Sequence, residues 1–308
     1  MKLLRVPFPV LLLVTLAALC LMVSDASPVK AQAAIPEPSL GQQVIYLTNL
    51  ARIQAGLSPL RENALLDQAA LTHARAMAES DFFAHDNPLT GTGPAERVTA
   101  TGYRWIAVAE NIFAGAQRPE DVVQKWLESP GHRANIMHPQ VREIGVGYAS
   151  DPDDRFPQAG SPYRYYWAQV FGADRDVYPI VISNEAFSTT TPVVSVSIYG
   201  DGWAQEMRIR NDEDAFSQWQ AYRHVREWRL KDKPGLRTVT IELRRGVDVR
   251  QASDTIYYLP GDVTAIAAFA VQAQTTPTAI AGLPSRLTTP VAIIRNVQPP
   301  ALDRKSVV

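Results

Sequence analysis

The chain has 308 residues, and its 30 basic and 31 acidic side chains leave a formal net charge of −1. Since neither sign dominates, the charge balance does not favour nucleic acid or an anionic membrane surface as a partner. Hydrophobic residues make up 46% of the chain, enough to build folded cores. A chain of this length is expected to form one large domain or two ordinary ones.

The first 33 residues have the pattern of a secretory signal peptide. Lys2 and Arg5 precede an apolar run over residues 11–23, and small residues follow, with cleavage expected near Ala31 or Ala33. The apolar run is shorter than the roughly 20 residues that a membrane span needs. We therefore expect a secreted or extracytoplasmic protein with no stable membrane span after cleavage. An uncleaved N-terminal anchor is the alternative.

The single cysteine, Cys20, lies within this apolar run. Leu19 stands before it, where a lipoprotein attachment site needs a small residue, so lipid attachment is not expected. A mature chain without cysteine cannot form disulfides, although its compartment permits them. This composition is more typical of a bacterial exported protein than of an animal one.

Helical periodicity follows a Pro-rich linker at residues 34–39. Apolar residues recur three or four positions apart before Gly56, which predicts a first helix. Start signals at Asn63, Pro94 and Pro119 predict three more, and Ser129-Pro130-Gly131 is expected to break the last of them.

Strands are expected over residues 143–149 and 163–171, after these helices. Because helices precede strands, residues 40–173 are predicted to form an α+β domain. From about residue 177, alternating β-branched segments separated by turns predict six further strands: 177–182, 193–199, 205–210, 225–230, 236–243 and 255–259. Residues 177–260 are therefore predicted to form a small all-β sandwich. Residues 261–308, rich in Ala, Thr, Pro and Gln, are predicted to be a disordered tail.

Five short stretches within residues 40–173 carry a family resemblance. They are Phe82-Phe83-Ala84-His85, Ala109-Glu110-Asn111-Ile112, the run from Trp126 to Ile136, Ile144-Gly145-Val146-Gly147-Tyr148, and the run from Tyr166 to Gly172. In this order and span they resemble the bacterial branch of the CAP superfamily (SCP/PR-1-like extracellular domain). The resemblance covers less than half of the chain. The β-rich part weakly resembles a bacterial Ig-like or fibronectin-like module.

The resemblance implies an α-β-α sandwich with a cavity lined by two His and two acidic residues. The matching positions in this chain are His85, Glu110 and His132, and the fourth position falls on Ser129 instead of an acid. The adjacent Glu128 is not a substitute, because each helical residue advances about 100° and Glu128 points away from the apolar stripe of its helix. We expect Glu128 in solvent and the tetrad incomplete.

Two imidazoles and a carboxylate can bind a divalent metal such as zinc, transfer protons near neutral pH, or only hydrogen-bond to one another. His85 and His132 are the expected metal ligands, and no residue is assigned a catalytic role. The sequence contains no HExxH, paired CxxC or GxSxG motif. Ser129 and His132 could suggest a nucleophile and its base, but no acidic orienter is evident.

Three functions remain open on this basis. The favoured one is a secreted protein whose cavity binds a divalent metal or a small extracellular ligand, lipid or cell-envelope glycan included. The alternatives are a metal-assisted extracellular hydrolase acting on peptides or lipids, and a structural envelope protein. The missing fourth acid counts against the enzyme.

Overall fold

The computed structural model describes residues 36–156, 161–261, 286–287 and 291–294. The chain divides into two units, Met1–Glu37 and Pro38–Val308, and only residues 36 and 37 of the first are described. The expected signal peptide, residues 1–33, lies outside the described residues. Among the helices that are described, none has the length and apolar character to cross a membrane.

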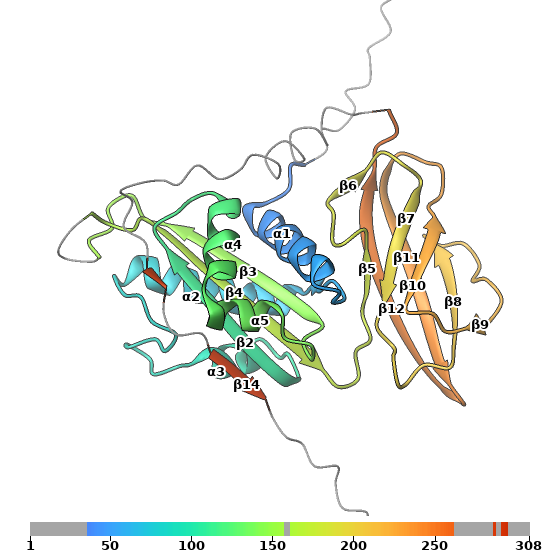
Figure 1. Ribbon diagram of the computed structural model, residues 1–308, viewed down its shortest axis with the longest axis horizontal. Helices are drawn as coiled ribbons and strands as arrows, with labels where there is room; N and C mark the ends of the chain where they lie inside the picture. Colours follow the sequence, from blue (N-terminus) through green and yellow to red (C-terminus); the bar gives the residue numbers. More distant parts are fainter. Residues whose placement is uncertain (1–35, 157–160, 262–285, 288–290, 295–308) are drawn as a thin grey trace, which may run out of the picture. The chain divides into compact units, whose positions relative to one another are not determined.

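Residues 40–174 alternate helices with the strands of one sheet (Figure 1). In chain order the elements are α1 (Leu40–Gln54), β1 (Arg61–Glu62), α2 (Ala64–Glu79), α3 (Pro94–Ala100), β2 (Trp105–Ala114), α4 (Pro119–Glu128), α5 (Pro130–Ile136), β3 (Glu143–Ser150) and β4 (Tyr165–Asp174). The strands pair in the order β1-β3-β4-β2, with β1 parallel to β3 and the other pairs antiparallel.

Local signals explain where these helices start. Ser39 and Gln42 form a capping box at α1, and the Asn63 side chain accepts from the backbone N–H groups of Leu65 and Leu66 at α2. Proline occupies the first turn of α3, α4 and α5, where its missing N–H leaves no hydrogen bond unmade.

Helix α5 corrects one sequence expectation. The expected end of the preceding helix is confirmed, since α4 ends at Glu128 and Ser129 is extended, but the new helix that begins directly at Pro130 was not expected. The physical reason is that proline disfavours helix at the residue before it while suiting the first helical position itself. The chain therefore turns sharply after α4, and α5 carries His132 back toward the sheet.

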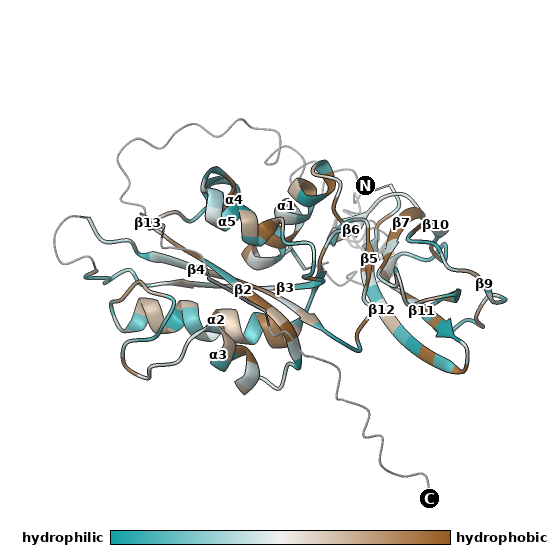
Figure 2. Cartoon of the chain, turned by 60° about the horizontal axis from the view of Figure 1, so that its bottom comes forward, coloured by the Kyte–Doolittle hydropathy of each residue, from teal (hydrophilic) through white to brown (hydrophobic). Residues whose placement is uncertain are grey.

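Helices cover both faces of the sheet (Figure 2). On one face α2 and α3 pack against a core that includes Met77, Val98 and Ile112. On the other face α1, α4 and α5 enclose a second core around Trp126 and Trp167. This is the predicted α-β-α sandwich. Strand β2 is buried at nine of its ten positions because it is covered on both sides, so its sequence lacks the two-residue alternation of a half-exposed strand.

Two glycines of β3 let α2 lie directly on the sheet. A Cβ at Gly147 would lie 2.3 Å from the carbonyl carbon of Ala70, and one at Gly145 would lie 2.2 Å from the backbone nitrogen of Asp67. Only glycine permits so close an approach of two backbones. This packing fixes the height of α2, which carries His73, above the sheet.

The β-rich part comprises β5 (Ile180–Ile182), β6 (Ser188–Thr189), β7 (Val193–Ile198), β8 (Glu206–Asn211), β9 (Gln220–Ala221), β10 (Val225–Arg229), β11 (Gly235–Arg245) and β12 (Asp248–Tyr258). Its sheets have the orders β10-β7-β5 and β6-β12-β11-β8-β9 and enclose one core that shares no residue with the other two. Two sheets around one core make a β-sandwich. The likeness to an Ig-like module stays a prediction.

Two short strands, β13 (Arg286–Leu287) and β14 (Val291–Ile294), differ from the expectation of a disordered tail. Both pair antiparallel with β2, and Val291 lies opposite Glu110. Without them the outer edge of β2 would present unpaired backbone groups, which favours addition of a strand there. The rest of the expected tail lies outside the described residues, apart from Gly261.

Candidate functional site

Glu110 is the centre of the candidate site. It lies in β2 and is fully buried. Its Oε1 lies 2.7 Å from Nδ1 of His85, and its Oε2 accepts a hydrogen bond of 2.8 Å from Nη2 of Arg97 on α3. A carboxylate must be paired to remain buried in the charged state, and here both oxygens have partners.

His73 supports this arrangement from α2. Its Nε2 donates to the backbone carbonyl of Ala84 at 2.9 Å, which holds the loop that carries His85. The same Nε2 lies 4.0 Å from Oε1 of Glu110. Burial lowers the pKa of His73 to about 4, so its imidazole is neutral at pH 7.

The electrostatic state of Glu110 follows from its neighbours. Burial alone would raise the pKa of this carboxyl, but the hydrogen bond from His85 and the electrostatic interactions with His73, Arg97 and His85 more than offset it. The net result is a pKa below the usual value of 4.5. Glu110 is therefore an ionised, weakly basic carboxylate at neutral pH.

His132 projects from α5 and completes the group. Its Nδ1 lies 2.8 Å from Oγ of Ser129, whereas its Nε2 is buried and has no hydrogen-bond partner. Burial and the nearby charge of His85 lower the pKa of His132 to about 4, so the ring is neutral. A buried nitrogen without a hydrogen-bond partner is unusual in a folded protein, which makes this atom a candidate for contact with a bound ligand.

A network of buried amides fixes α5 on the sheet. Asn135 of α5 donates from Nδ2 to the backbone carbonyl of Glu110 at 3.1 Å and to Oδ1 of Asn111 at 3.0 Å. Asn111 donates in turn to the backbone carbonyl of His132 at 3.2 Å and to Oε1 of Gln169 at 3.0 Å. These bonds couple the positions of His132 and Glu110, which lie on different elements.

The fourth position is occupied by Ser129, and the neighbouring Glu128 takes no part. The side chain of Glu128 is 49% exposed and bonds to Lys125 and Gln124 on its own helix, which confirms the expectation that it lies in solvent. The sequence reasoning did not identify Arg97. A lone arginine in a short helix gives no signal of its own, and only the packing of α3 against β2 brings it to Glu110.

The donor set can be tested against a divalent metal. Within the described ranges no group of three or more His, Cys, Asp or Glu side chains is arranged to hold a metal ion. Glu110 is engaged by Arg97 and His85, so the candidate ligands are the imidazoles of His85 and His132. His85 contacts Glu110 through Nδ1, and Nε2 of His132 is buried without a hydrogen-bond partner. An imidazole that a carboxylate orients is a usual zinc ligand, and His85 has such a partner, whereas His132 has the neutral hydroxyl of Ser129.

A second group of polar side chains lies outside this site. Nε2 of His224 lies 3.1 Å from Oγ of Ser58, and its Nδ1 lies 2.8 Å from a carboxylate oxygen of Asp201. The three side chains are connected in the sequence Ser–His–Asp, as in a catalytic triad. The contact between Nδ1 of His224 and Asp201 is short, but it does not have the alignment of a hydrogen bond. The side chain of Asp201 is 69% exposed and cannot hold the imidazole in one orientation as a buried orienter does.

The region that holds the first of these sites matches a known family. Residues 45–171 match the model of CAP, the cysteine-rich secretory protein family. The chain is 36% identical over 107 residues to the uncharacterized protein YkwD of Bacillus subtilis (strain 168), over 35% of this chain and 41% of YkwD. It is 27% identical over 106 residues to the uncharacterized membrane protein YlbC of the same organism, over 34% of this chain and 30% of YlbC. The match thus spans less than half the length of either relative.

Among solved structures, an extracellular protein containing an SCP domain from Bacillus anthracis str. Ames shares 27% identity and a TM-score of 0.37 with the chain, covering 44% of this chain and 40% of that one. An outer surface protein from Borrelia burgdorferi shares 20% identity and a TM-score of 0.38 with the chain. This match covers 46% of this chain and 98% of the Borrelia protein. The family-model match, together with the α-β-α sandwich built here by the same residues, shows that residues 45–171 form a CAP domain.

Proposed function

We propose that this is an exported protein whose CAP domain binds a divalent metal ion of the zinc type through His85 and His132. The observation that carries the proposal is Nε2 of His132, which is buried on a neutral imidazole and has no hydrogen-bond partner. In the tautomer in which Nδ1 donates to Ser129, Nε2 carries a lone pair that is available to a metal without prior loss of a proton.

The contact between Glu110 and His85 supports the same proposal. A carboxylate that accepts from one imidazole nitrogen fixes the tautomer and raises the basicity of the other nitrogen, which is the usual support of a metal-bound histidine. Ser129 takes the corresponding place behind His132 but is neutral. We therefore expect a weaker site than one with an acid at that position.

A hydrolase is less well supported by the geometry. A metal-assisted hydrolase needs a carboxylate or imidazole to accept a proton from water. Glu110 is paired with Arg97 through one oxygen and with His85 through the other, and its pKa is lowered, so it is a poor base.

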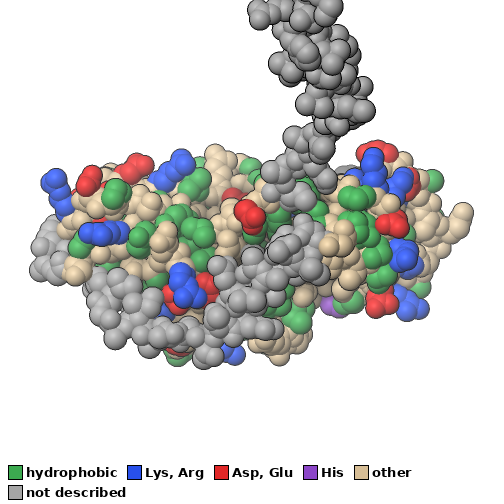
Figure 3. Space-filling model, turned by 90° about the horizontal axis from the view of Figure 1, so that it is seen from above, with side chains coloured by type: hydrophobic (Ala, Val, Ile, Leu, Met, Phe, Trp, Pro, Cys, Tyr) green, Lys and Arg blue, Asp and Glu red, His purple; other side chains and the backbone are tan. Residues whose placement is uncertain are grey.

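Export and the absence of a nucleic-acid partner belong to the same proposal. The N-terminal sequence supports export, and the family whose model matches is described as one of secretory proteins. On the uncovered part of the one face that Figure 3 shows, basic and acidic side chains are interspersed and form no large patch of one sign. A nucleic-acid partner would require a basic patch.

The experiment is a calorimetric titration of the full chain with Zn²⁺ at pH 7.5. We expect one site, and an affinity at least tenfold lower in the double variant His85→Gln/His132→Gln. His138→Gln is the matched control, because His138 lies outside the site and its Nδ1 accepts a bond from the backbone of Gln140. At a 100-fold excess of Zn²⁺ over its Kd, linkage predicts a gain of about 2.7 kcal/mol in the free energy of unfolding.

A second variant is expected to strengthen Zn²⁺ binding instead of weakening it. Ser129→Glu places a carboxylate behind His132, so we expect Zn²⁺ affinity to rise by about tenfold or more. If the folded wild-type chain does not respond to Zn²⁺, the metal proposal is wrong and a structural role of the domain is favoured. Cleavage of a peptide library that requires Glu110 would instead favour the hydrolase.

A further inference from the structure

The turn after β5 joins the β-rich part to the CAP domain through a strained backbone. Ser183, Asn184 and Glu185 have φ values of 46°, 63° and 67°, in the left-handed region that side chains disfavour. Three such residues in a row persist only where surrounding contacts hold them. Here Asn49 of α1 donates to the backbone carbonyl of Asn184 at 3.1 Å, and the backbone N–H of Glu62 donates to Oε1 of Glu185 at 2.6 Å.

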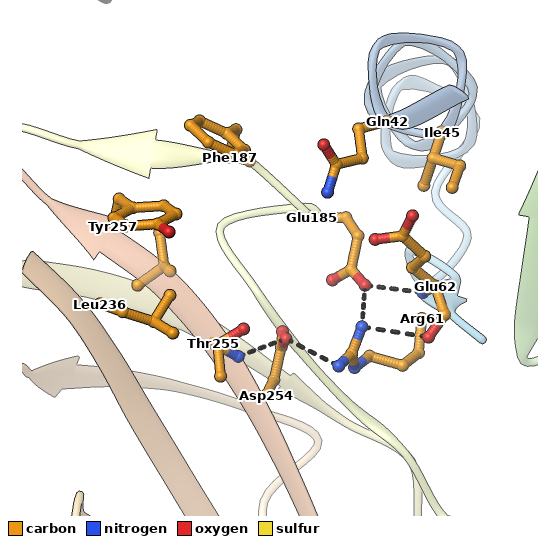
Figure 4. A pocket seen from close by; sticks show the side chains of 12 residues that line it. Gln42, Ile45, Arg61, Glu62, Glu185, Phe187, Leu236, Asp254, Thr255 and Tyr257 are labelled. Carbon is orange, nitrogen blue, oxygen red and sulfur yellow. Dashed lines mark hydrogen bonds and ion pairs between the residues drawn. The ribbon is translucent and has the colours of Figure 1, made fainter. Parts of the chain in front are cut away.

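Arg61 of β1 connects this turn to β12 (Figure 4). Its Nη1 donates to Oε1 of Glu185 at 2.5 Å, and its Nη2 lies 3.3 Å from Oδ1 of Asp254. The Asp254 carboxylate also accepts from the backbone N–H groups of Ile182 and Thr255. One guanidinium of the CAP domain thus faces two carboxylates of the β-rich part, whose side chains are 7% and 3% exposed.

The charges of this cluster do not balance when every group is ionised. Burial and the charge of Asp254 raise the pKa of Glu185 well above its usual value, against the opposing effect of Arg61. Burial likewise raises the pKa of Asp254. The surrounding elements add further acid, with Glu62 on β1 and Asp67 on α2, while α1 contributes the neutral Gln42. The cluster therefore favours a state with a proton on the carboxylate pair.

We propose that Arg61, Glu185 and Asp254 form a pH-sensitive lock, which holds the CAP domain and the β-rich part together in acid and loosens as the medium becomes alkaline. When the shared proton is lost, two buried carboxylates repel each other and one guanidinium cannot neutralise both. Folded-state pKa values above the unfolded ones mean that this contribution is complete below the ordinary carboxyl pKa of about 4, and is lost as the pH rises through the raised values.

The surroundings allow the lock to open without unfolding either part. The β-rich core is separate from the two cores of the CAP domain, so neither loses its packing on release. A cavity of about 130 Å³ adjoins the lock and is lined by residues from both parts, Gln42 and Phe187 among them, which gives water a place beside the carboxylates. Other polar contacts between the described residues of the two parts would have to break as well. They include Ser58 with His224, the Tyr199 hydroxyl with the carbonyl of Pro59, Asn49 with the carbonyl of Asn184, and Arg142 with the carbonyl of Val177.

The test measures the distance between the two parts in the full chain. Dyes are placed on Gln54→Cys in α1 and Val247→Cys in the β11–β12 turn, both exposed positions, with Cys20→Ser removing the native thiol. From pH 5 to pH 9 we expect the population at longer distance to grow at least twofold in energy-transfer measurements. Glu185→Gln, which keeps the shape of the protonated acid, should remain closed across this range.

Controls separate the lock from general effects of pH. Glu213→Gln removes an acid whose side chain is 96% exposed and should behave as wild type. Arg61→Met should open the lock at pH 5 as well. A wild-type distance distribution that does not change with pH would overturn the proposal, as would an unchanged pH response in Glu185→Gln. If Arg61→Met fails to fold, the comparison of Glu185→Gln with wild type still decides.

Discussion

Arg97→Met tests how strongly the candidate site depends on charge neutralisation inside the CAP domain. The change removes the guanidinium whose Nη2 lies 2.8 Å from Glu110 and leaves a fully buried carboxylate with His85 as its remaining strong partner. Breaking a buried ion pair on one side typically costs about 3–5 kcal/mol. We expect a loss of about that size in the free energy of unfolding at pH 7, measured by urea denaturation with tryptophan fluorescence.

The pH dependence of the Arg97→Met variant gives the sharper result. In the wild type the pKa of Glu110 is lowered, so its contribution to stability is present above the usual value of 4.5 and is lost as the pH falls through the folded value. Without Arg97, burial should raise the pKa of Glu110, and stability should then be lost as the pH rises through that value. The deficit of the variant should therefore be larger at pH 7 than at pH 5.

Two comparisons complete this experiment. Adding Glu110→Gln to Arg97→Met should recover stability at pH 7, because the second change removes the unpaired charge. Arg104→Met, at a side chain that is 73% exposed, should change stability by less than about 0.5 kcal/mol. A deficit for Arg97→Met below about 1 kcal/mol, or one that is equal at both pH values, would refute the argument.

Two further predictions concern the packing of α2 on β3. Burial, and to a smaller extent the charge of Glu62, raises the pKa of Asp67 to about 7. The contribution of Asp67 to stability is therefore complete below its usual pKa of 3.8 and is lost as the pH rises to 7. This loss amounts to at most about 4 kcal/mol in the free energy of unfolding. Asp67→Asn keeps an acceptor for the N–H of Val146 and should flatten urea-measured stability between pH 4 and 7, whereas an unchanged slope would contradict this. Gly147→Ala forces a Cβ to within 2.3 Å of the backbone of Ala70, so we expect a loss of about 3 kcal/mol or more, and a thermal midpoint within about 2 °C of wild type would contradict it.

The sequence could predict the elements whose start signals are local. Asn63 and Pro94 begin α2 and α3 as expected, because a cap or a first-turn proline acts over a few residues. It could not predict β2 as a strand, since burial on both faces removes the alternating pattern. It also missed α5, because Pro130 and Gly131 look like a break until the turn before them is known.

For the candidate site, too, the sequence could indicate some residues and not others. The motifs that hold His85, Glu110 and His132 indicate three side chains, and the structure connects the first two by a 2.7 Å contact and positions the third by the amides of α5. Arg97 and Arg61 could not be found, because their partners are defined only by tertiary packing. Arg61 and Asp254 lie far apart along the chain and meet across the boundary between the two parts.

Two features of the candidate site concern charge. Ser129 stands where an acid is expected and keeps a contact of 2.8 Å with His132, so the imidazole is still held but without a negative charge behind it. Arg97 neutralises the remaining acid, Glu110. Because burial lowers the pKa of both His73 and His132 to about 4, their imidazoles are neutral at pH 7, and such an imidazole is better suited to ligate than to transfer protons at that pH. The fold alone therefore does not determine the chemistry of this site, which depends on the side chains at these positions.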